Sequence, residues 1–154
     1  MDKPLRNKLN QFVPEWLTDG SWFLVTIKCV PQGTNQLSRI GVGDVVLSSL
    51  AYNHDKLIWH CRLGLLMPDH LHGIIAFPPG GMETTIKSWK KFVASKLSVA
   101  WEHGFFGHRL RHHRELQEKT SYVQMNPVRK GLCERAEDWV WVYRPADRPP
   151  TLLG

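Results

Sequence analysis

The chain has 154 residues, of which 42% are hydrophobic and 22% are charged. This length allows one domain with short tails and excludes a TIM barrel or a two-domain dinucleotide enzyme, while the apolar content excludes wholesale disorder. The formal net charge of +6 favours a polyanionic partner, most often a nucleic acid.

The N-terminal part of the chain is predicted to hold an extension, a strand and a short helix. Residues 1–20 are polar and punctuated by proline, and we interpret them as an N-terminal extension. Aromatic and β-branched residues predict a buried strand over 22–30. A mixed run predicts a helix over 44–52.

A hairpin is predicted in the middle of the chain. Two apolar runs predict strands over 58–67 and 70–77, and the turn-forming pair Pro68-Asp69 separates them. Alternation predicts that one face of the first strand holds Trp59, Cys61, Leu63, Leu65 and Met67.

The C-terminal half adds two helices with a strand between them. Helical periodicity extends over 83–103, and its apolar stripe is expected to comprise Ile86, Trp89, Val93, Leu97 and Ala100. Residues 105–111 predict a short strand. A second helix is predicted over 114–126, where Pro127 ends it.

This order of elements predicts an α+β fold in which helices pack on a largely antiparallel sheet. We expect the domain to occupy residues 21–144 and a C-terminal tail to occupy 145–154. Three cysteines without a CxxC pair argue against a disulfide framework and for a reducing compartment. With no apparent signal peptide or bilayer-spanning run, we expect no membrane partner and a cytoplasmic, nucleoid-associated protein.

Basic residues are concentrated in one block of the chain. Residues 87–130 hold ten basic and three acidic side chains, whereas the rest of the chain is close to neutral. The alternatives are a surface that contacts a nucleic acid and a solvated charged face.

His70 and His72 lie two residues apart on a predicted strand, so both imidazoles are expected on the same face. Such a pair can bind a divalent cation, or it can be an exposed pair without a role. Eight histidines in the chain make a chance pair a serious alternative. The pair opens an otherwise apolar strand, which favours a metal site.

Tyr122 and Asn126 are four residues apart, so both are expected on one face of the second helix. A tyrosine hydroxyl can attack a phosphodiester when a metal polarises the phosphate, and an amide oxygen is a ligand suited to Mg²⁺ or Mn²⁺. The alternatives are an amphipathic side chain at the edge of the core for Tyr122 and a helix terminator for Asn126.

Two separated motifs resemble those of the single-tyrosine HUH transposases, and they occur in the same order. Residues 66–75 (LMPDHLHGII) are similar to the family's strand with the pattern MPNHxH. Residues 122–132 (YVQMNPVRKGL) resemble its Y-I-x-x-N-P-V-x-x-G-L helix, and residues 138–141 (DWVW) resemble the D-W-P-W that follows. The resemblance covers roughly residues 20–143 and points to the REP-associated tyrosine transposase group.

The resemblance implies a ferredoxin-like antiparallel sheet sandwiched with helices. It also implies Mg²⁺ or Mn²⁺ held by His70, His72 and Asn126. Tyr122 would attack a DNA phosphate, remain joined to the 5′ side and free a 3′-hydroxyl. Asp69 departs from the pattern, because Asn is usual at that position.

We therefore expect a transposase or endonuclease that cleaves and transfers single-stranded DNA beside a hairpin, at palindromic repeats. The basic residues expected to contact the DNA are Lys87, Lys90, Lys91, Arg109, Arg111 and Arg129. The alternatives are a catalytically idle DNA-binding protein of the same fold and a small metal-dependent hydrolase. Both a monomer and a homodimer are compatible with the sequence.

Overall fold

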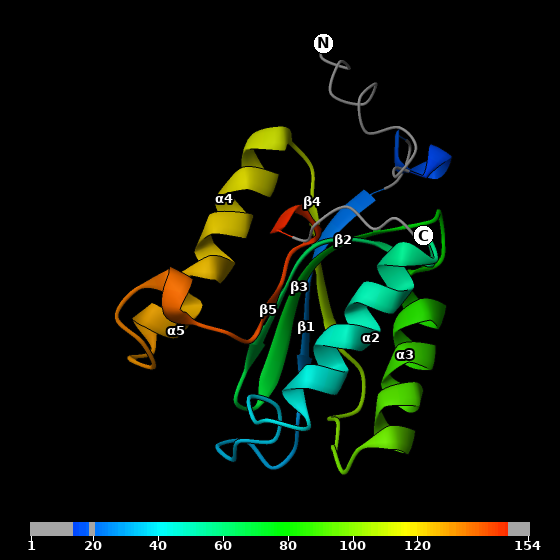
Figure 1. Ribbon diagram of the computed structural model, residues 1–154. Helices are drawn as coiled ribbons and strands as arrows, with labels where there is room; N and C mark the ends of the chain where they lie inside the picture. The colour runs from blue at the N-terminus through cyan, green and yellow to red at the C-terminus, as the bar shows by residue number, and fades with distance from the viewer. Residues whose placement is uncertain (1–13, 19–20, 148–154) are drawn as a thin grey trace.

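One five-stranded antiparallel sheet runs through the molecule in a computed structural model that describes residues 14–18 and 21–147 (Figure 1). The strands are β1 (Ser21–Lys28), β2 (His60–Met67), β3 (His70–Phe77), β4 (Phe106–Leu110) and β5 (Val142–Tyr143). Their order across the sheet is β4-β1-β3-β2-β5. The predicted hairpin is confirmed, because Met67 of β2 pairs with His70 of β3.

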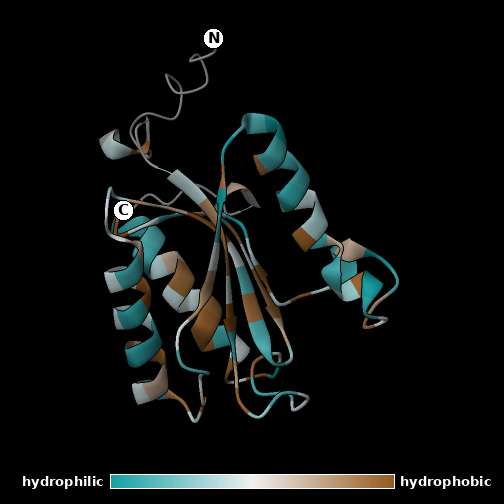
Figure 2. Cartoon of the chain, turned by 180° about the vertical axis from the view of Figure 1, so that it is seen from behind, coloured by the Kyte–Doolittle hydropathy of each residue, from teal (hydrophilic) through white to brown (hydrophobic). Residues whose placement is uncertain are grey.

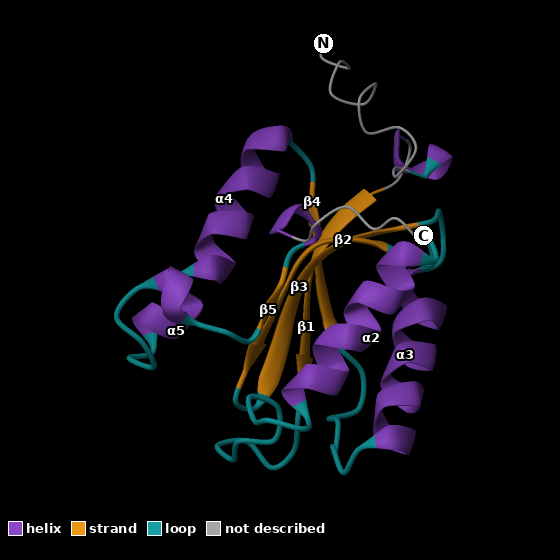
Figure 3. Cartoon of the chain, viewed as in Figure 1, coloured by secondary structure: helices purple, strands orange, loops and turns teal. Residues whose placement is uncertain are grey.

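The helices cover both faces of this sheet (Figure 3). They are α2 (Gly43–Asp55), α3 (Met82–Lys96), α4 (His113–Gln124) and the single turn α5 (Asn126–Arg129). Helices α2 and α3 lie on one face, and α4 lies on the other (Figure 1). The chain order β1-α2-β2-β3-α3-β4 confirms the α+β, ferredoxin-like prediction. Across the described residues, no helix is long and apolar enough to cross a membrane.

Each face of the sheet has its own hydrophobic core, and apolar residues gather on the strands between the helices (Figure 2). The core under α2 and α3, here called the α2–α3 core, includes Val25, Leu50, Trp59, Leu71, Ile75, Ile86, Trp89 and Val93. The core under α4, here called the α4 core, comprises Leu63, Leu65, Met67, Ile74, Leu110, Leu116 and Val123. The sheet therefore presents one apolar surface to each helix layer.

A bulge in β2 overturns the expectation that its alternate residues share one face. Cys61 pairs with Ile75 of β3. Leu63 pairs with the neighbouring Ile74, so Arg62 is an extra residue in β2. Because side chains alternate with period two, one extra residue moves all later side chains to the opposite face. The predicted single face is wrong, because Trp59 and Cys61 belong to the α2–α3 core and Leu63, Leu65 and Met67 to the α4 core.

Helix α3 is shorter than predicted. It ends at Lys96, and Leu97 is already extended, with φ −134° and ψ 161°. The following segment runs back to the sheet, where Trp101 forms an antiparallel bridge with Cys29. Val99 is buried on the way, so tertiary packing overrides the helical periodicity there. The expected stripe holds only for its helical members, Ile86, Trp89 and Val93.

Short turns of 3-10 helix lie at both ends of the described chain, over Glu15–Thr18 and Pro145–Asp147. The second turn contacts β2. The rest of the predicted extension and tail, residues 1–13, 19–20 and 148–154, lies outside the described residues. Strand β1 begins at Ser21 and strand β5 ends at Tyr143, and the domain boundaries at residues 21 and 144 stay predictions.

Candidate functional site

The paired histidines open β3 and lie on the face of the sheet that α4 covers. Ile74, two residues after His72, belongs to the α4 core, so the alternation of β3 places both imidazoles on that side. Their ring centroids are 4.7 Å apart at an interplanar angle of 81°. The prediction that the two rings share a face is therefore confirmed.

A neighbouring oxygen holds one ring nitrogen of each histidine. Nδ1 of His70 lies 2.9 Å from Oδ1 of Asp69, and Nδ1 of His72 lies 3.1 Å from Oγ1 of Thr26. When these nitrogens carry the proton and donate it, Nε2 of each ring keeps its lone pair. This is the arrangement in which a carboxylate or hydroxyl orients a metal-ligating imidazole.

The electrostatics of the pair favour a neutral ring at His72. Burial lowers the pKa of His72 to about 3, and the positive charges of His70, Arg129 and Lys130 add to the effect. For Asp69, burial alone would raise the pKa, but hydrogen bonds from the Gly33 N–H and from His70 outweigh it and lower the value. The neutral His72 ring and the His70 ring, which Asp69 orients, can together offer two nitrogen lone pairs to a divalent cation.

Tyr122 and Asn126 lie on two successive helices. Helix α4 ends at Gln124, and α5 begins at Asn126 with Pro127 in its first turn. Proline cannot continue the α4 hydrogen-bond ladder, but it suits the start of a helix. The side chain of Asn126 is buried, with 7% of its surface exposed, whereas Tyr122 is 55% exposed. The two side chains differ in exposure, and their expected position on one helix face stays a prediction.

Arg129 connects these two residues. Its guanidinium carbon lies 3.7 Å from the centroid of the Tyr122 ring. Its Nη2 donates to the backbone oxygen of Tyr122 at 2.8 Å and to Oδ1 of Asn126 at 3.4 Å. Arg129 is predicted from the sequence to contact DNA, and the structure places its cation against the tyrosine ring while the residue stays exposed.

The donor set fits a Mg²⁺ or Mn²⁺ ion in part. His70 and His72 offer two imidazole nitrogens with their orienting partners in place. The Asn126 amide oxygen is the only member of the predicted set from another element, and it already accepts a long bond from Arg129. The described residues contain no group of three or more His, Cys, Asp or Glu that could hold a metal. A third ligand therefore has to be an amide, water or a substrate oxygen.

The structure does not bring the predicted α3 lysines to the histidine pair. Lys87, Lys90 and Lys91 lie on α3, across the sheet from His70 and His72 (Figure 1). Lys90 is moreover engaged, since its Nζ donates to two backbone oxygens of the segment before β4, at 2.9 and 2.6 Å. Its ammonium anchors that segment.

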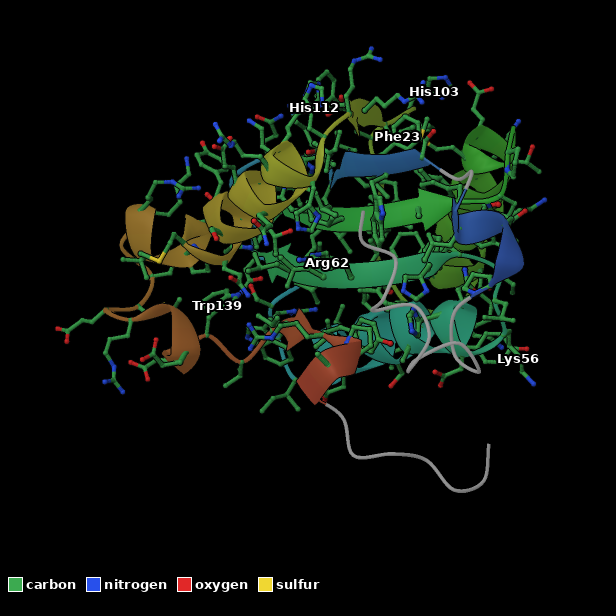
Figure 4. The ribbon with its side chains drawn as sticks, turned by 90° about the horizontal axis from the view of Figure 1, so that it is seen from above. Phe23, Lys56, Arg62, His103, His112 and Trp139 are labelled. Carbon is green, nitrogen blue, oxygen red and sulfur yellow. The ribbon has the colours of Figure 1, made fainter. Side chains whose placement is uncertain are left out.

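Arg109 and Arg111 do come together. They line one open pocket of about 310 Å³ where β1 and β4 meet the start of α4, together with His112 and His113. His112, labelled in Figure 4, lies directly before α4. Glu115 of α4 connects this helix to β4 and to the segment after it. Its carboxylate accepts a hydrogen bond from the Arg111 backbone N–H at 2.8 Å and pairs with His108 at 3.0 Å. Two predicted DNA contacts thus share a basic pocket.

The other tyrosines lie far from this face. Tyr143 is buried, and its ring packs 6.1 Å from that of His54. Tyr52 is exposed on α2, on the opposite side of the sheet. In the described part of the chain, Tyr122 is therefore the only exposed tyrosine on the α4 side.

Sequence reasoning gave no role to Asp69 and Thr26, the two residues that orient the histidines. Asp69 was interpreted as a turn residue, although its position directly before His70 offered a signal. Thr26 pairs with His72 across β1 and β3, and only the strand register reveals that contact. The signal for Thr26 is therefore absent from the linear sequence.

The fold and this site describe an α+β domain in which a strand carries two paired histidines and the helix that covers it carries an exposed tyrosine. A solved structure of a REP-associated tyrosine transposase bound to a REP hairpin superposes with a TM-score of 0.67 at 20% identity, covering 86% of this chain and 87% of that one. The chain is also 28% identical over 80 residues to the REP-associated tyrosine transposase of Escherichia coli (strain K12).

These similarities confirm the resemblance drawn from the motifs and the fold that it implied. The segment matched to the Escherichia coli protein spans 49% of this chain and 48% of that relative, so about half of each is compared. No family model matches the chain.

Proposed function

We propose that this protein binds hairpin-forming single-stranded DNA and cleaves and rejoins one strand through Tyr122. The observation that carries the proposal is an exposed tyrosine on the helix that covers the paired histidines. The net charge of +6 and the pocket lined by Arg109 and Arg111 suit a phosphate backbone. The hairpin named with the structural relative supports the choice of substrate.

In this mechanism, the chain's own groups bind the backbone and supply the nucleophile. The hydroxyl oxygen of Tyr122 bonds to phosphorus, and its proton passes to water at this exposed position. The bond from phosphorus to the 3′ oxygen breaks, and that oxygen takes a proton to become a 3′-hydroxyl. A divalent cation held by His70 and His72 would polarise the phosphate. The phosphotyrosine ester keeps the energy for rejoining, so no nucleotide cofactor is required.

The test is a covalent adduct that resists denaturation. Labelled single-stranded hairpin DNA is incubated with the protein and Mn²⁺, denatured and separated on a gel. We expect the wild type to give a shifted band and Tyr122→Phe to give none. Tyr52→Phe is the matched control, because Tyr52 is equally exposed but lies on α2. A persisting band in Tyr122→Phe contradicts the assignment.

The same experiment separates the alternative functions. A catalytically idle DNA-binding protein would retain the hairpin without any covalent band. A metal-dependent hydrolase would release cut DNA with no adduct at any time point. Only strand transfer gives an adduct that disappears when a 3′-hydroxyl strand is added back.

A further inference from the structure

We propose that Arg129 is a positioning residue that holds the Tyr122 side chain in one orientation, an inference that rests on the proposed role of Tyr122. The guanidinium carbon of Arg129 lies 3.7 Å from the centroid of the Tyr122 ring, well inside the range of a cation–π contact. The same group donates to the Tyr122 backbone oxygen at 2.8 Å. Arg129 therefore contacts both the ring and the backbone of one residue.

The contact spans the junction of α4 and α5. Met125, with φ −88° and ψ −2°, still donates its N–H to the Ser121 oxygen at 3.2 Å, and α5 begins at the next residue, Asn126. The last carbonyls of a helix lack intrahelical donors, and Arg129 supplies a donor to one of them. Its second bond, to Oδ1 of Asn126, ties the first residue of α5 to the same cation.

Other contacts to the ring are weak. Tyr122 is 55% exposed, so core packing does not fix its side chain. The Lys119 ammonium lies farther from the ring centroid, at 5.6 Å. A nucleophile that samples several rotamers loses rate, because reaction requires one geometry. Arg129 supplies the restraint that burial does not.

Arginine is suited to this task because its planar fork donates in fixed directions while its face stacks on an aromatic ring. Lysine in its place would keep the charge and a contact to the ring but would lose the fork. The proposal gives Arg129 a role other than phosphate binding, since its exposed cation contacts both the ring and the backbone oxygen of Tyr122.

The first experiment measures the ring directly, without activity. The chain has three tyrosines, so 3-fluorotyrosine labelling gives three ¹⁹F resonances, and Tyr122→Phe identifies the one of interest. In Arg129→Ala we expect this resonance to move to the position found in the unfolded protein. Lys130→Ala, which removes the neighbouring exposed charge, should leave it in place. An unmoved resonance in Arg129→Ala overturns the proposal.

The second experiment measures the reaction and the binding separately. We expect Arg129→Ala to slow adduct formation about tenfold, with Arg129→Lys between it and the wild type. The Kd for the hairpin and its salt dependence should stay unchanged. A salt slope lowered by about 0.7 would assign Arg129 to a phosphate contact and overturn the positioning role.

The results of the two experiments distinguish the proposed function from the positioning role of Arg129. If no adduct forms with the wild type, the proposed function fails while the ¹⁹F result still decides whether Arg129 fixes the ring. If adduct forms at an equal rate in Arg129→Ala, the positioning role fails and the proposed function stands. If circular dichroism shows that Arg129→Ala is unfolded, the same two measurements are made on Arg129→Lys and Arg129→Gln.

Discussion

At the scale of single residues, the two adjacent histidines of β3 each have one ring nitrogen fixed by a neighbouring oxygen. Asp69 and Thr26 hold one nitrogen of each ring, which leaves the other available as a ligand. An isolated exposed histidine has no such restraint and binds a cation weakly.

We therefore expect the double variant His70→Ala, His72→Ala to lose Mn²⁺ binding in a calorimetric titration, together with adduct formation. Hairpin affinity should largely remain, because phosphate contacts lie elsewhere. The double variant His112→Ala, His113→Ala removes two exposed histidines and is the matched control. Equal Mn²⁺ affinity in the two double variants would remove the metal site.

His60 gives a residue-scale prediction on stability. Burial lowers its pKa from 6.5 to about 4, and the charges of His54 and Arg62 add to the effect. The unfolded chain then binds the proton more tightly than the folded one, so acid favours unfolding. Stability is lost as pH falls below 6.5, and the loss levels off below about 4.

The measurement is urea unfolding of wild type and His60→Phe at pH 7 and pH 4.5. We expect the wild type to lose about 1–3 kcal/mol more than the variant over this interval. Other titrating groups are present in both proteins and cancel in the difference. Parallel pH profiles would show that His60 titrates equally in the folded and unfolded states.

At the scale of elements, the two helix layers should contribute differently to DNA binding. The α4 side carries the histidine pair and lies beside the pocket of Arg109 and Arg111, whereas Lys87 and Lys91 lie across the sheet on α3. Each lost phosphate contact lowers the slope of log affinity against log salt by about 0.7 on single strands.

We expect Arg111→Gln, at the start of α4, to flatten this slope by up to about 0.7, because one phosphate contact is removed. Lys87→Gln removes the same charge from the other layer and should leave the slope nearly unchanged. Fluorescence anisotropy over a range of salt concentrations measures both. The reverse result would place the DNA on α3.

The elements also show how far the sequence could be interpreted. The hairpin was predicted residue by residue in β3, because period-two alternation and Pro68-Asp69 are local signals. The bulge at Arg62 could not be predicted, since it depends on which β3 residue pairs with each β2 residue. The two-residue strand β5 is too short to carry a pattern.

The site also contains features that the sequence predicts and features that only the structure shows. Spacing alone placed His70 and His72 on one face, and the structure confirms it. Tyr122 and Asn126 belong to successive helices, because Pro127 directly after Asn126 suits the start of α5 and cannot continue the α4 ladder. Arg129 follows Tyr122 by about two helical turns, so spacing allows the two to meet, but only the structure shows that the guanidinium contacts the ring.

At the scale of the whole molecule, the sheet separates a layer with the larger hydrophobic core from a layer that carries the proposed site. The α2–α3 core holds most of the large buried side chains, including Trp59 and Trp89. The α4 core is smaller, and α4 contributes only Leu116 and Val123 as buried residues. Fewer buried apolar contacts mean a lower free energy of local opening.

This asymmetry predicts the order in which the backbone opens. In hydrogen exchange followed by mass spectrometry, peptides from α4 and α5 should exchange faster than peptides from α3. Mn²⁺ together with hairpin DNA should slow exchange in α4, α5 and the start of β3, because bound groups order the segments that they contact. Helix α3 should keep its free-state rate, which makes it the internal control. If protection appears on α3 and not on α4, the DNA lies on the opposite face of the sheet from the histidine pair, and Tyr122 cannot reach its phosphate.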